Sequence, residues 1–107
     1  MSKITTHVLD TVAGRPAAGI AVTLQHSIAG EWKELARAVT DADGRARNLL
    51  PDDYALEPGL YSLRFETAAI SAFFPEVVIR FRVEHPAQHY HVPVLLSAYG
   101  YSTYRGS

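Results

Sequence analysis

Apolar and polar residues alternate one by one in short segments along almost the whole chain. The clearest segment is 76–83, in which every second residue is a large apolar one: Val77, Ile79, Phe81 and Val83. Side chains of a β-strand point alternately to its two faces, so a period of two indicates a strand with one buried face. Gly, Pro and Asp separate the segments as turn residues do. The pattern therefore predicts an all-β fold.

The spacing of these segments predicts the type of β fold. We predict seven strands, with an eighth beginning at 101–104: 4–9, 20–26, 32–40, 45–49, 61–66, 76–83 and 89–96. Turns are predicted at 28–31 and 41–44, and a loop at 11–19. Seven or eight short strands at near-regular spacing are typical of an antiparallel β-sandwich. Residues 66–73 form the only helical candidate, and we expect that helix to be absent or vestigial.

Composition limits the class of protein. The 107 residues suit one compact domain, 1–107, and 48% of them are hydrophobic, enough for a single core. The net charge of −1 has no basic cluster, so we expect neither a nucleic-acid nor a membrane partner. The N-terminus lacks the apolar stretch of a signal peptide. The absence of cysteine excludes disulfides and fits a reducing cytosol, so we expect a soluble cytoplasmic protein.

Two histidines stand out, His7 and His91, because each lies in a predicted strand, opposite the more apolar face. In 89–96 the alternation turns Tyr90, Val92 and Val94 inward. The residues that face away from the core are then His89, His91, Pro93 and Leu95. Such a face suggests a cleft or an interface between subunits, with solvated surface histidines as the alternative. We interpret the other three histidines as surface residues: His26, His85 and His89.

Two kinds of chemistry fit this histidine face. His89 and His91 lie about 7 Å apart on one strand face, and His7 would supply a third zinc ligand if its strand is the neighbour. No His-Glu-x-x-His motif supports zinc, so we expect no metal and no cofactor. No cysteine or Gly-x-Ser-x-Gly motif supports a covalent nucleophile. If the protein is a hydrolase, we expect activated water to be the nucleophile.

Three segments together resemble the 5-hydroxyisourate hydrolases of the transthyretin-like family. They are 5–11 with 14–17, then 40–45, and finally 89–97 with the terminal 104–107. They occur in the family's order and near its spacings, so the resemblance covers essentially the whole chain. The terminal Tyr-Arg-Gly-Ser is its most specific part. Hormone-carrying transthyretins share the fold but lack this terminus and the two active-site histidines.

The resemblance implies a transthyretin-like sandwich that assembles as a homotetramer, a dimer of dimers, with active sites along a channel between the dimers. The family's active-site residues correspond here to His7, Arg45 and His91. The residues that close the site, some of them from a neighbouring subunit, correspond to Tyr104, Arg105, Gly106 and Ser107. Family members usually carry a longer, helical stretch where this chain has only 67–72.

The resemblance also implies a reaction. The family adds water to a ring carbonyl of 5-hydroxyisourate and opens the six-membered ring, which gives 2-oxo-4-hydroxy-4-carboxy-5-ureidoimidazoline. His7 or His91 would deprotonate the water, and Arg45 would stabilise the developing negative charge. The alternative is a non-catalytic protein of the same fold that binds a small ligand, because a fold does not fix a function.

Overall fold

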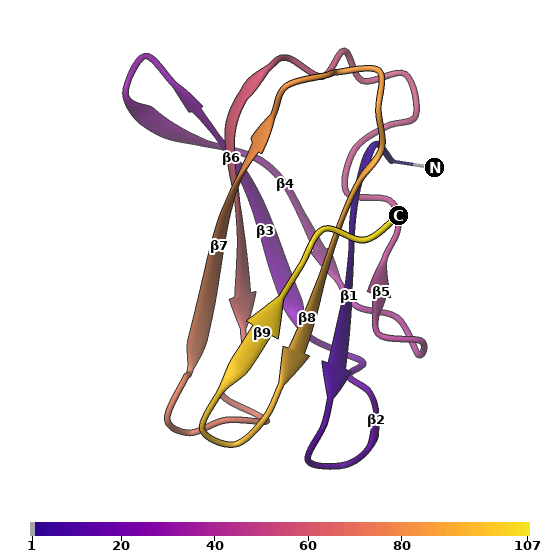
Figure 1. Cartoon of the computed structure of the whole chain (residues 1–107), viewed down its shortest axis with the longest axis vertical. Helices are drawn as coiled ribbons and strands as arrows, with labels where there is room; N and C mark the ends of the chain where they lie inside the picture. Colours follow the sequence, from indigo (N-terminus) through magenta and orange to yellow (C-terminus); the bar gives the residue numbers. More distant parts are fainter. Residues whose placement is uncertain (1) are drawn as a thin grey trace.

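The computed structural model describes residues 2–107 and consists of two β-sheets packed face to face (Figure 1). The strands are β1 Ile4–Asp10, β2 Arg15–Pro16, β3 Ala21–Ile28, β4 Glu31–Val39, β5 Arg45–Ala46, β6 Gly59–Glu66, β7 Glu76–Val83, β8 Tyr90–Leu96 and β9 Tyr101–Thr103. The predicted all-β, transthyretin-like sandwich is confirmed. The ninth strand is the two-residue β2, which lies in the segment 11–19 that we expected to be a loop, and the strand predicted at 45–49 forms only at Arg45–Ala46.

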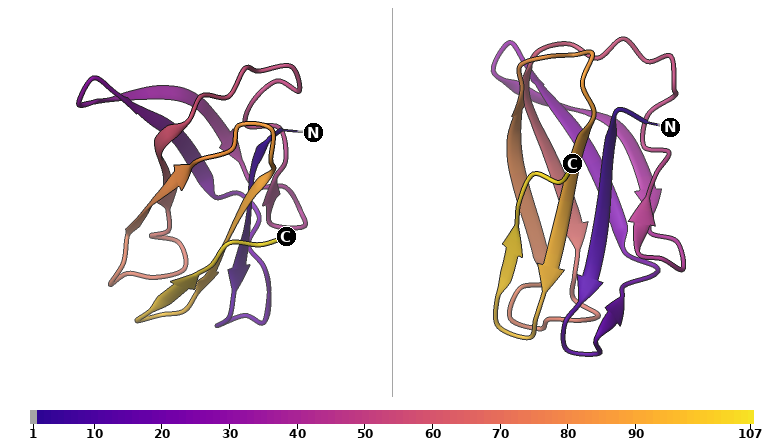
Figure 2. Two further views of the ribbon diagram at one scale, coloured as in Figure 1. Left: turned by 45° about the horizontal axis from the view of Figure 1, so that its top comes forward. Right: turned by 45° about the vertical axis from the view of Figure 1, so that its right-hand side comes forward.

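The two sheets have the orders β2-β1-β8-β9, with β5 also paired to β1, and β4-β3-β6-β7. Figure 2 shows the two layers from two further directions. One pair departs from the predicted antiparallel arrangement, because β1 and β8 run parallel. Alternation has a period of two in either orientation, so the sequence pattern does not distinguish them. This central pair carries the histidine-bearing face.

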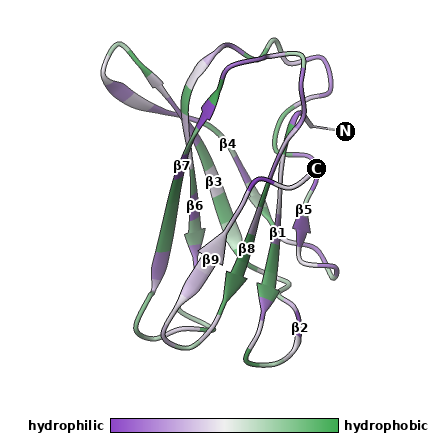
Figure 3. Ribbon diagram, viewed as in Figure 1, coloured by the Kyte–Doolittle hydropathy of each residue, from purple (hydrophilic) through white to green (hydrophobic). Residues whose placement is uncertain are grey.

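The core lies between the sheets and is built mainly from residues of the strands, with Leu49, Leu50 and Leu56 added from the connection between β5 and β6. Figure 3 shows the hydrophobic segments in the strands of both sheets. Tyr61, Leu63 and Phe65 of β6 are each fully buried. From β7, Val77 and Val83 join them, while Phe81 is only partly buried and packs against the core. Each large apolar side chain buried in this way contributes about 1.5–3 kcal/mol to stability. That burial holds the sheets rigid beneath the outer face of β1 and β8.

The segment 67–75 forms a turn, not a helix. The N–H groups of Ile70 and Ser71 both donate to the carbonyl oxygen of Thr67, at 3.0 and 2.9 Å. The Ser71 hydroxyl then donates to the carbonyl of Ala98 at 2.7 Å, in the connection between β8 and β9. Within residues 2–107 the structure has no helix long and apolar enough to cross a membrane.

Candidate active site

Three strands of one sheet place their outward side chains in a common cleft. The antiparallel pairing of β1 with β5 sets His7 opposite Arg45, and the parallel pairing of β1 with β8 sets Thr5 opposite His91. The cleft has a volume of about 480 Å³. Its lining comprises Thr5, Thr6, His7, Arg45, Arg47, His89, His91, Pro93, Tyr104, Gly106 and Ser107. Residues distant in sequence therefore meet because of strand register.

The turn before β5 fixes the position of Arg45. Asp41 Oδ1 accepts hydrogen bonds from the N–H groups of Asp43 and Arg45, at 2.9 and 3.0 Å. The hydrogen bond from Arg45 N–H is the main reason that the pKa of Asp41 lies below its ordinary value. Gly44 adopts a φ of 75°, and its carbonyl accepts from Val8 N–H at 2.7 Å. The Asp41 side chain thus closes the turn, and the hydrogen bond from Val8 joins the turn to β1.

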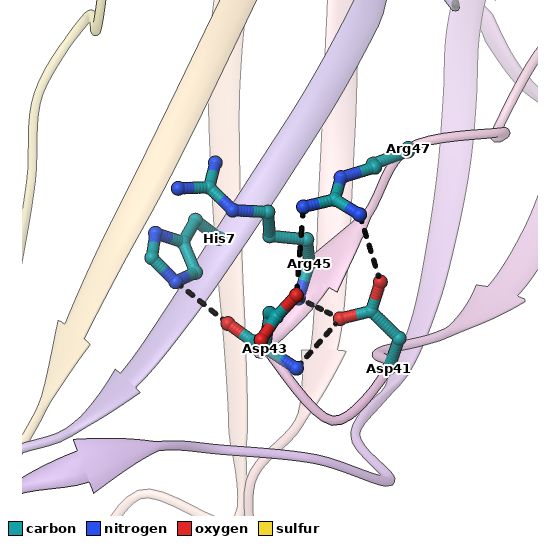
Figure 4. A network of polar contacts seen from close by, with 5 residues as sticks. All are labelled: His7, Asp41, Asp43, Arg45 and Arg47. Atoms are coloured by element: carbon teal, nitrogen blue, oxygen red, sulfur yellow. Dashed lines mark hydrogen bonds and ion pairs between the residues drawn. The ribbon is translucent and has the colours of Figure 1, made fainter.

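Arg47 forms ion pairs with both carboxylates of this turn (Figure 4). Its two terminal nitrogens lie 3.7 Å from Asp41 Oδ2 and 3.6 Å from Asp43 Oδ2. In the part of the chain that the structure describes, neither carboxylate forms an ion pair with Arg45. The Arg45 guanidinium therefore remains available to an anionic or electron-rich ligand in the cleft.

The hydrogen bonding of His7 identifies which ring nitrogen carries its proton. Nε2 lies 2.8 Å from the carbonyl oxygen of Asp43. A carbonyl oxygen only accepts, so Nε2 must be the donor. In the neutral ring, Nδ1 then keeps its lone pair and can accept a hydrogen bond.

His91 is half-buried in the cleft, and its Nδ1 lies 2.8 Å from Thr5 Oγ1. The pKa of His91 lies below its ordinary value, first because burial penalises the charged ring. The positive charge of Arg45 lowers the pKa further, followed by the charged forms of His89 and His7. A lowered pKa keeps the imidazole neutral near pH 7, where it is able to accept a proton.

The chain terminus lies along the cleft beside His91. Gly106 pairs with His91 in an antiparallel bridge, and its N–H donates to the His91 carbonyl at 2.8 Å. One residue of β9 also joins the tail to β8, since the Thr103 hydroxyl donates to the Pro93 carbonyl at 2.7 Å. Pro93 lines the cleft, as its place on the outward face of 89–96 predicted, although it is buried within the single chain. Leu95 is half-buried.

Arg105 is the one predicted site residue that does not line this cleft. Its guanidinium carbon lies 4.4 Å from the centre of the Tyr90 ring, a cation–π contact. Its Nη2 donates to Gln88 Oε1 at 3.1 Å. In the single chain Arg105 therefore braces the tail against β8. The other six predicted residues all line the cleft.

The sequence interpretation missed His89 as a cleft residue, although the alternation had placed it on the same face as His91. The alternation also placed Thr5 on the same strand face as His7, but the sequence interpretation did not include Thr5 in the site. For His26 the surface interpretation was wrong. Its ring is buried and stacks on Tyr61, with ring centres 4.1 Å apart. His85 is exposed, as we expected.

The histidines do not form the zinc site that the sequence left open as an alternative. The rings of His89 and His91 have centres 6.2 Å apart. Across residues 2–107, no three side chains of His, Cys, Asp or Glu gather closely enough to hold a metal ion.

Known proteins resemble this chain over its whole length. Residues 4–106 match the sequence model of the HIUase/Transthyretin family. A 5-hydroxyisourate hydrolase of Caulobacter vibrioides is 44% identical over an alignment of 117 residues, gaps included, that covers 100% of both chains. The 5-hydroxyisourate hydrolase of Klebsiella pneumoniae superposes with a TM-score of 0.79 at 37% identity, covering 97% of this chain and 98% of that one.

A transthyretin structure shares the fold as well. Sea bream transthyretin in complex with thyroxine superposes with a TM-score of 0.88 at 30% identity, covering 98% of this chain and 95% of that one. The family match spans nearly the entire chain, and the hydrolase similarity has the same extent. The chain therefore belongs to the HIUase/Transthyretin family.

Proposed function

We propose that this protein is a 5-hydroxyisourate hydrolase of urate degradation. It adds water to a ring carbonyl of 5-hydroxyisourate and opens the six-membered ring to 2-oxo-4-hydroxy-4-carboxy-5-ureidoimidazoline. The observation that carries the proposal is the convergence of His7, Arg45 and His91, from three strands, on one cleft. The chain's similarity to enzymes named 5-hydroxyisourate hydrolase over its full length supports the same substrate.

His91 is the general base in this proposal. Its Nδ1 is held by Thr5, which leaves Nε2 as the nitrogen available to a water molecule. Its lowered pKa keeps the ring neutral at the pH where it must accept a proton. A positioned base of this kind accelerates a reaction by about 10²–10⁴-fold.

Besides a base, the reaction needs a group that stabilises the developing oxyanion and a group that orients the attacking water. Arg45 and His7 supply these two groups in this proposal. The Arg45 guanidinium stays protonated and offers planar donors to the oxyanion that develops on the attacked carbonyl. One preorganised donor of this kind is worth about 3–4 kcal/mol in the transition state. His7 orients the attacking water through Nδ1, because Nε2 is occupied by the Asp43 carbonyl.

The terminal residues orient the substrate from the rim of the cleft. Tyr104 and Ser107 offer hydroxyl groups, and Gly106 brings the backbone close to His91. Arg105 belongs to the binding machinery indirectly, because its contact with Tyr90 holds the tail in place. No metal or cofactor takes part in the proposed reaction.

We further propose that the protein works in the cytoplasm as one domain, 1–107, assembled as a homotetramer. Strand β9 forms one edge of its sheet and β7 one edge of the other, and these two edges lie on the same side of the sandwich (Figure 1). A second copy can therefore extend both sheets together. Light scattering on the purified protein measures the assembly directly, and a monomer would contradict this part of the proposal.

A non-catalytic ligand-binding protein is the second candidate. It is favoured by the TM-score of 0.88 with a transthyretin that holds thyroxine. A carrier has no need of a histidine and an arginine guanidinium in one cleft, however, and His91 and Arg45 both line the cleft here. The hydrolase is therefore the better explanation.

The deciding experiment follows the ultraviolet decay of freshly generated 5-hydroxyisourate, with wild-type protein and with His91→Ala and His7→Ala. We expect the wild type to accelerate the decay, and each variant to lose most of the acceleration while keeping its assembly state. A folded wild type without acceleration would make the carrier the correct interpretation. Near wild-type rates in both variants would refute the assigned roles.

A further inference from the structure

A buried hydroxyl group lies between two imidazole rings in the cleft. Thr5 Oγ1 is 2.8 Å from His91 Nδ1 and also 2.8 Å from His89 Nε2. Thr5 is only 4% exposed, whereas His89 is exposed to solvent. The three groups therefore form a continuous hydrogen-bonded chain from the half-buried His91 to the surface.

The chemistry of a hydroxyl restricts how protons occupy this chain. A hydroxyl has one hydrogen to donate, so at most one of the two neighbouring ring nitrogens accepts from Thr5, and the other then donates to it. In one arrangement His91 Nδ1–H donates to Thr5, whose hydroxyl donates to His89 Nε2. His91 Nε2 is then unprotonated and basic. In the reverse arrangement His89 donates, and His91 carries its proton on Nε2.

We propose that Thr5 and His89 are positioning residues that relay a proton between His91 and solvent during the reaction. The proposal rests on the proposed hydrolase function and adds two residues to it. In the base-competent arrangement, His91 Nε2 accepts a proton from water as the oxygen forms its bond to the substrate carbonyl. The Nδ1 proton passes to Thr5 Oγ1, and the Thr5 hydroxyl proton passes to His89 Nε2.

After this transfer the hydrogen-bonded groups are in the reverse arrangement. His89 becomes an imidazolium and releases its Nδ1 proton to solvent. His91 is then neutral with its proton on Nε2, ready to donate to the leaving nitrogen. One proton has left the cleft for the solvent, and its return along the same chain restores the base.

Electrostatics favours moving the charge to His89. An imidazolium at His91 is partly desolvated and lies in the field of the Arg45 guanidinium, with His7 and His89 as further titratable neighbours. His89 is exposed, so water solvates its positive charge. The relay thus removes the charge from the place where it costs most.

Kinetics of paired variants tests the relay. Thr5→Val keeps the shape and strand preference of the side chain but removes the hydroxyl, whereas Thr5→Ser keeps the hydroxyl. We expect Thr5→Val to lower kcat by about 10–100-fold with a smaller change in KM, and Thr5→Ser to restore most of kcat. Equal rates for Thr5→Val and wild type would overturn the proposal, as would equal losses in Thr5→Val and Thr5→Ser.

Chemical rescue tests the role of His89. We expect His89→Gln to lose activity and to regain it as imidazole buffer is added, because a dissolved base can take the proton from Thr5. The matched control is His85→Gln, which replaces another exposed histidine that lies outside the cleft. The control should show neither the loss nor the response to imidazole. A loss in His89→Gln that imidazole does not restore would refute proton transfer through His89.

Nuclear magnetic resonance tests the relay without the reaction. The ¹⁵N shifts of His91 report which ring nitrogen is protonated, and we expect the tautomer balance and pKa of His91 to change in Thr5→Val but not in Thr5→Ser. Unchanged His91 shifts in Thr5→Val would overturn the relay even in an active enzyme. If the protein does not hydrolyse 5-hydroxyisourate but these shifts do change, the proposed function fails and the hydrogen-bonded chain stands.

Discussion

Gly106 lies so close to the His91 ring that a Cβ atom at residue 106 would be 2.6 Å from His91 Cδ2. The Gly106 N–H also donates to the His91 carbonyl at 2.8 Å, so backbone and ring are both held. On its other edge the ring is held at Nδ1 by Thr5. The orientation of His91 therefore depends on a glycine in the chain terminus as well as on its own strand.

Replacing Gly106 with alanine should disturb the ring directly. Real Cβ atoms do not approach a ring carbon this closely, so either the His91 side chain or the tail must move. A displacement of about 1 Å at a reacting group costs up to about 100-fold in rate. We expect Gly106→Ala to lower kcat/KM by about 10–100-fold with little change in melting temperature, because the tail lies outside the core. Unchanged kinetics would show that the close approach has no role in catalysis.

The turn before Arg45 should depend on the oxygen of residue 41 more than on its charge. Asp41 Oδ1 accepts the N–H groups of Asp43 and Arg45, and asparagine retains such an oxygen. We expect Asp41→Asn to keep most of kcat/KM and Asp41→Ala to lose more, because only alanine releases the Arg45 backbone. Steady-state kinetics of the two variants measures the difference. Equal activities in the two variants would contradict this account of how Arg45 is positioned.

Gly44 should be far less tolerant of substitution than other glycines with positive φ. A Cβ at residue 44 would lie 2.4 Å from the backbone oxygen of Val8, an atom that cannot move without disturbing β1. Gly14 has a similar φ of 71° but no atom within 4 Å of such a Cβ, so it is the matched control. We expect Gly14→Ala to cost about 1–2 kcal/mol, and Gly44→Ala to cost more than about 3 kcal/mol. Denaturant unfolding of both variants gives the two free energies, and equal values would refute the steric argument.

The alternation of residues was sufficient to predict the sandwich and the face on which the cleft lies. The inward residues of β7 were predicted from a period of two, and all of them are buried except Phe81, which is partly buried. His7 and His91 were placed on outward faces for the same reason. Alternation does not predict which strands pair or whether they run parallel, because strand order and direction depend on contacts between distant segments. The parallel pairing of β1 and β8 is therefore absent from the sequence pattern.

That missing pairing explains the residues that were overlooked. Thr5 becomes a partner of His91 only because the parallel register sets the two residues opposite each other. His89 lies just before β8, and its significance depends on the Thr5 hydroxyl that reaches it. Arg105 was grouped with the site because it belongs to a terminal motif, but its side chain turns toward Tyr90. A sequence motif identifies which segment belongs to a site, but the direction in which each side chain points is known only from the folded structure.

Metal removal should leave activity unchanged. In the described chain no three candidate ligands gather, and the His89 and His91 rings are bridged by Thr5 instead. We therefore expect dialysis against EDTA to have no effect on the rate of 5-hydroxyisourate decay. Loss of activity that added zinc restores would show that the histidines rearrange around a metal, and the proposed roles would have to be revised.

The pH dependence of activity should follow the lowered pKa of His91. A free histidine titrates near about pH 6.5, and burial, followed by the charge of Arg45, moves the pKa of His91 below that value. Since the neutral ring is the active base, kcat/KM should stay high as the pH falls through about 6.5 and decline only at lower pH.

The lowered pKa of His91 also affects stability. Between that pKa and about pH 6.5, the unfolded chain binds more protons than the folded one. The free energy of unfolding should therefore rise with pH between the lowered pKa and about 6.5. A pH–rate profile checks the first expectation and denaturant unfolding at several pH values checks the second. An acid limb centred above 6.5 would mean that another group supplies the base.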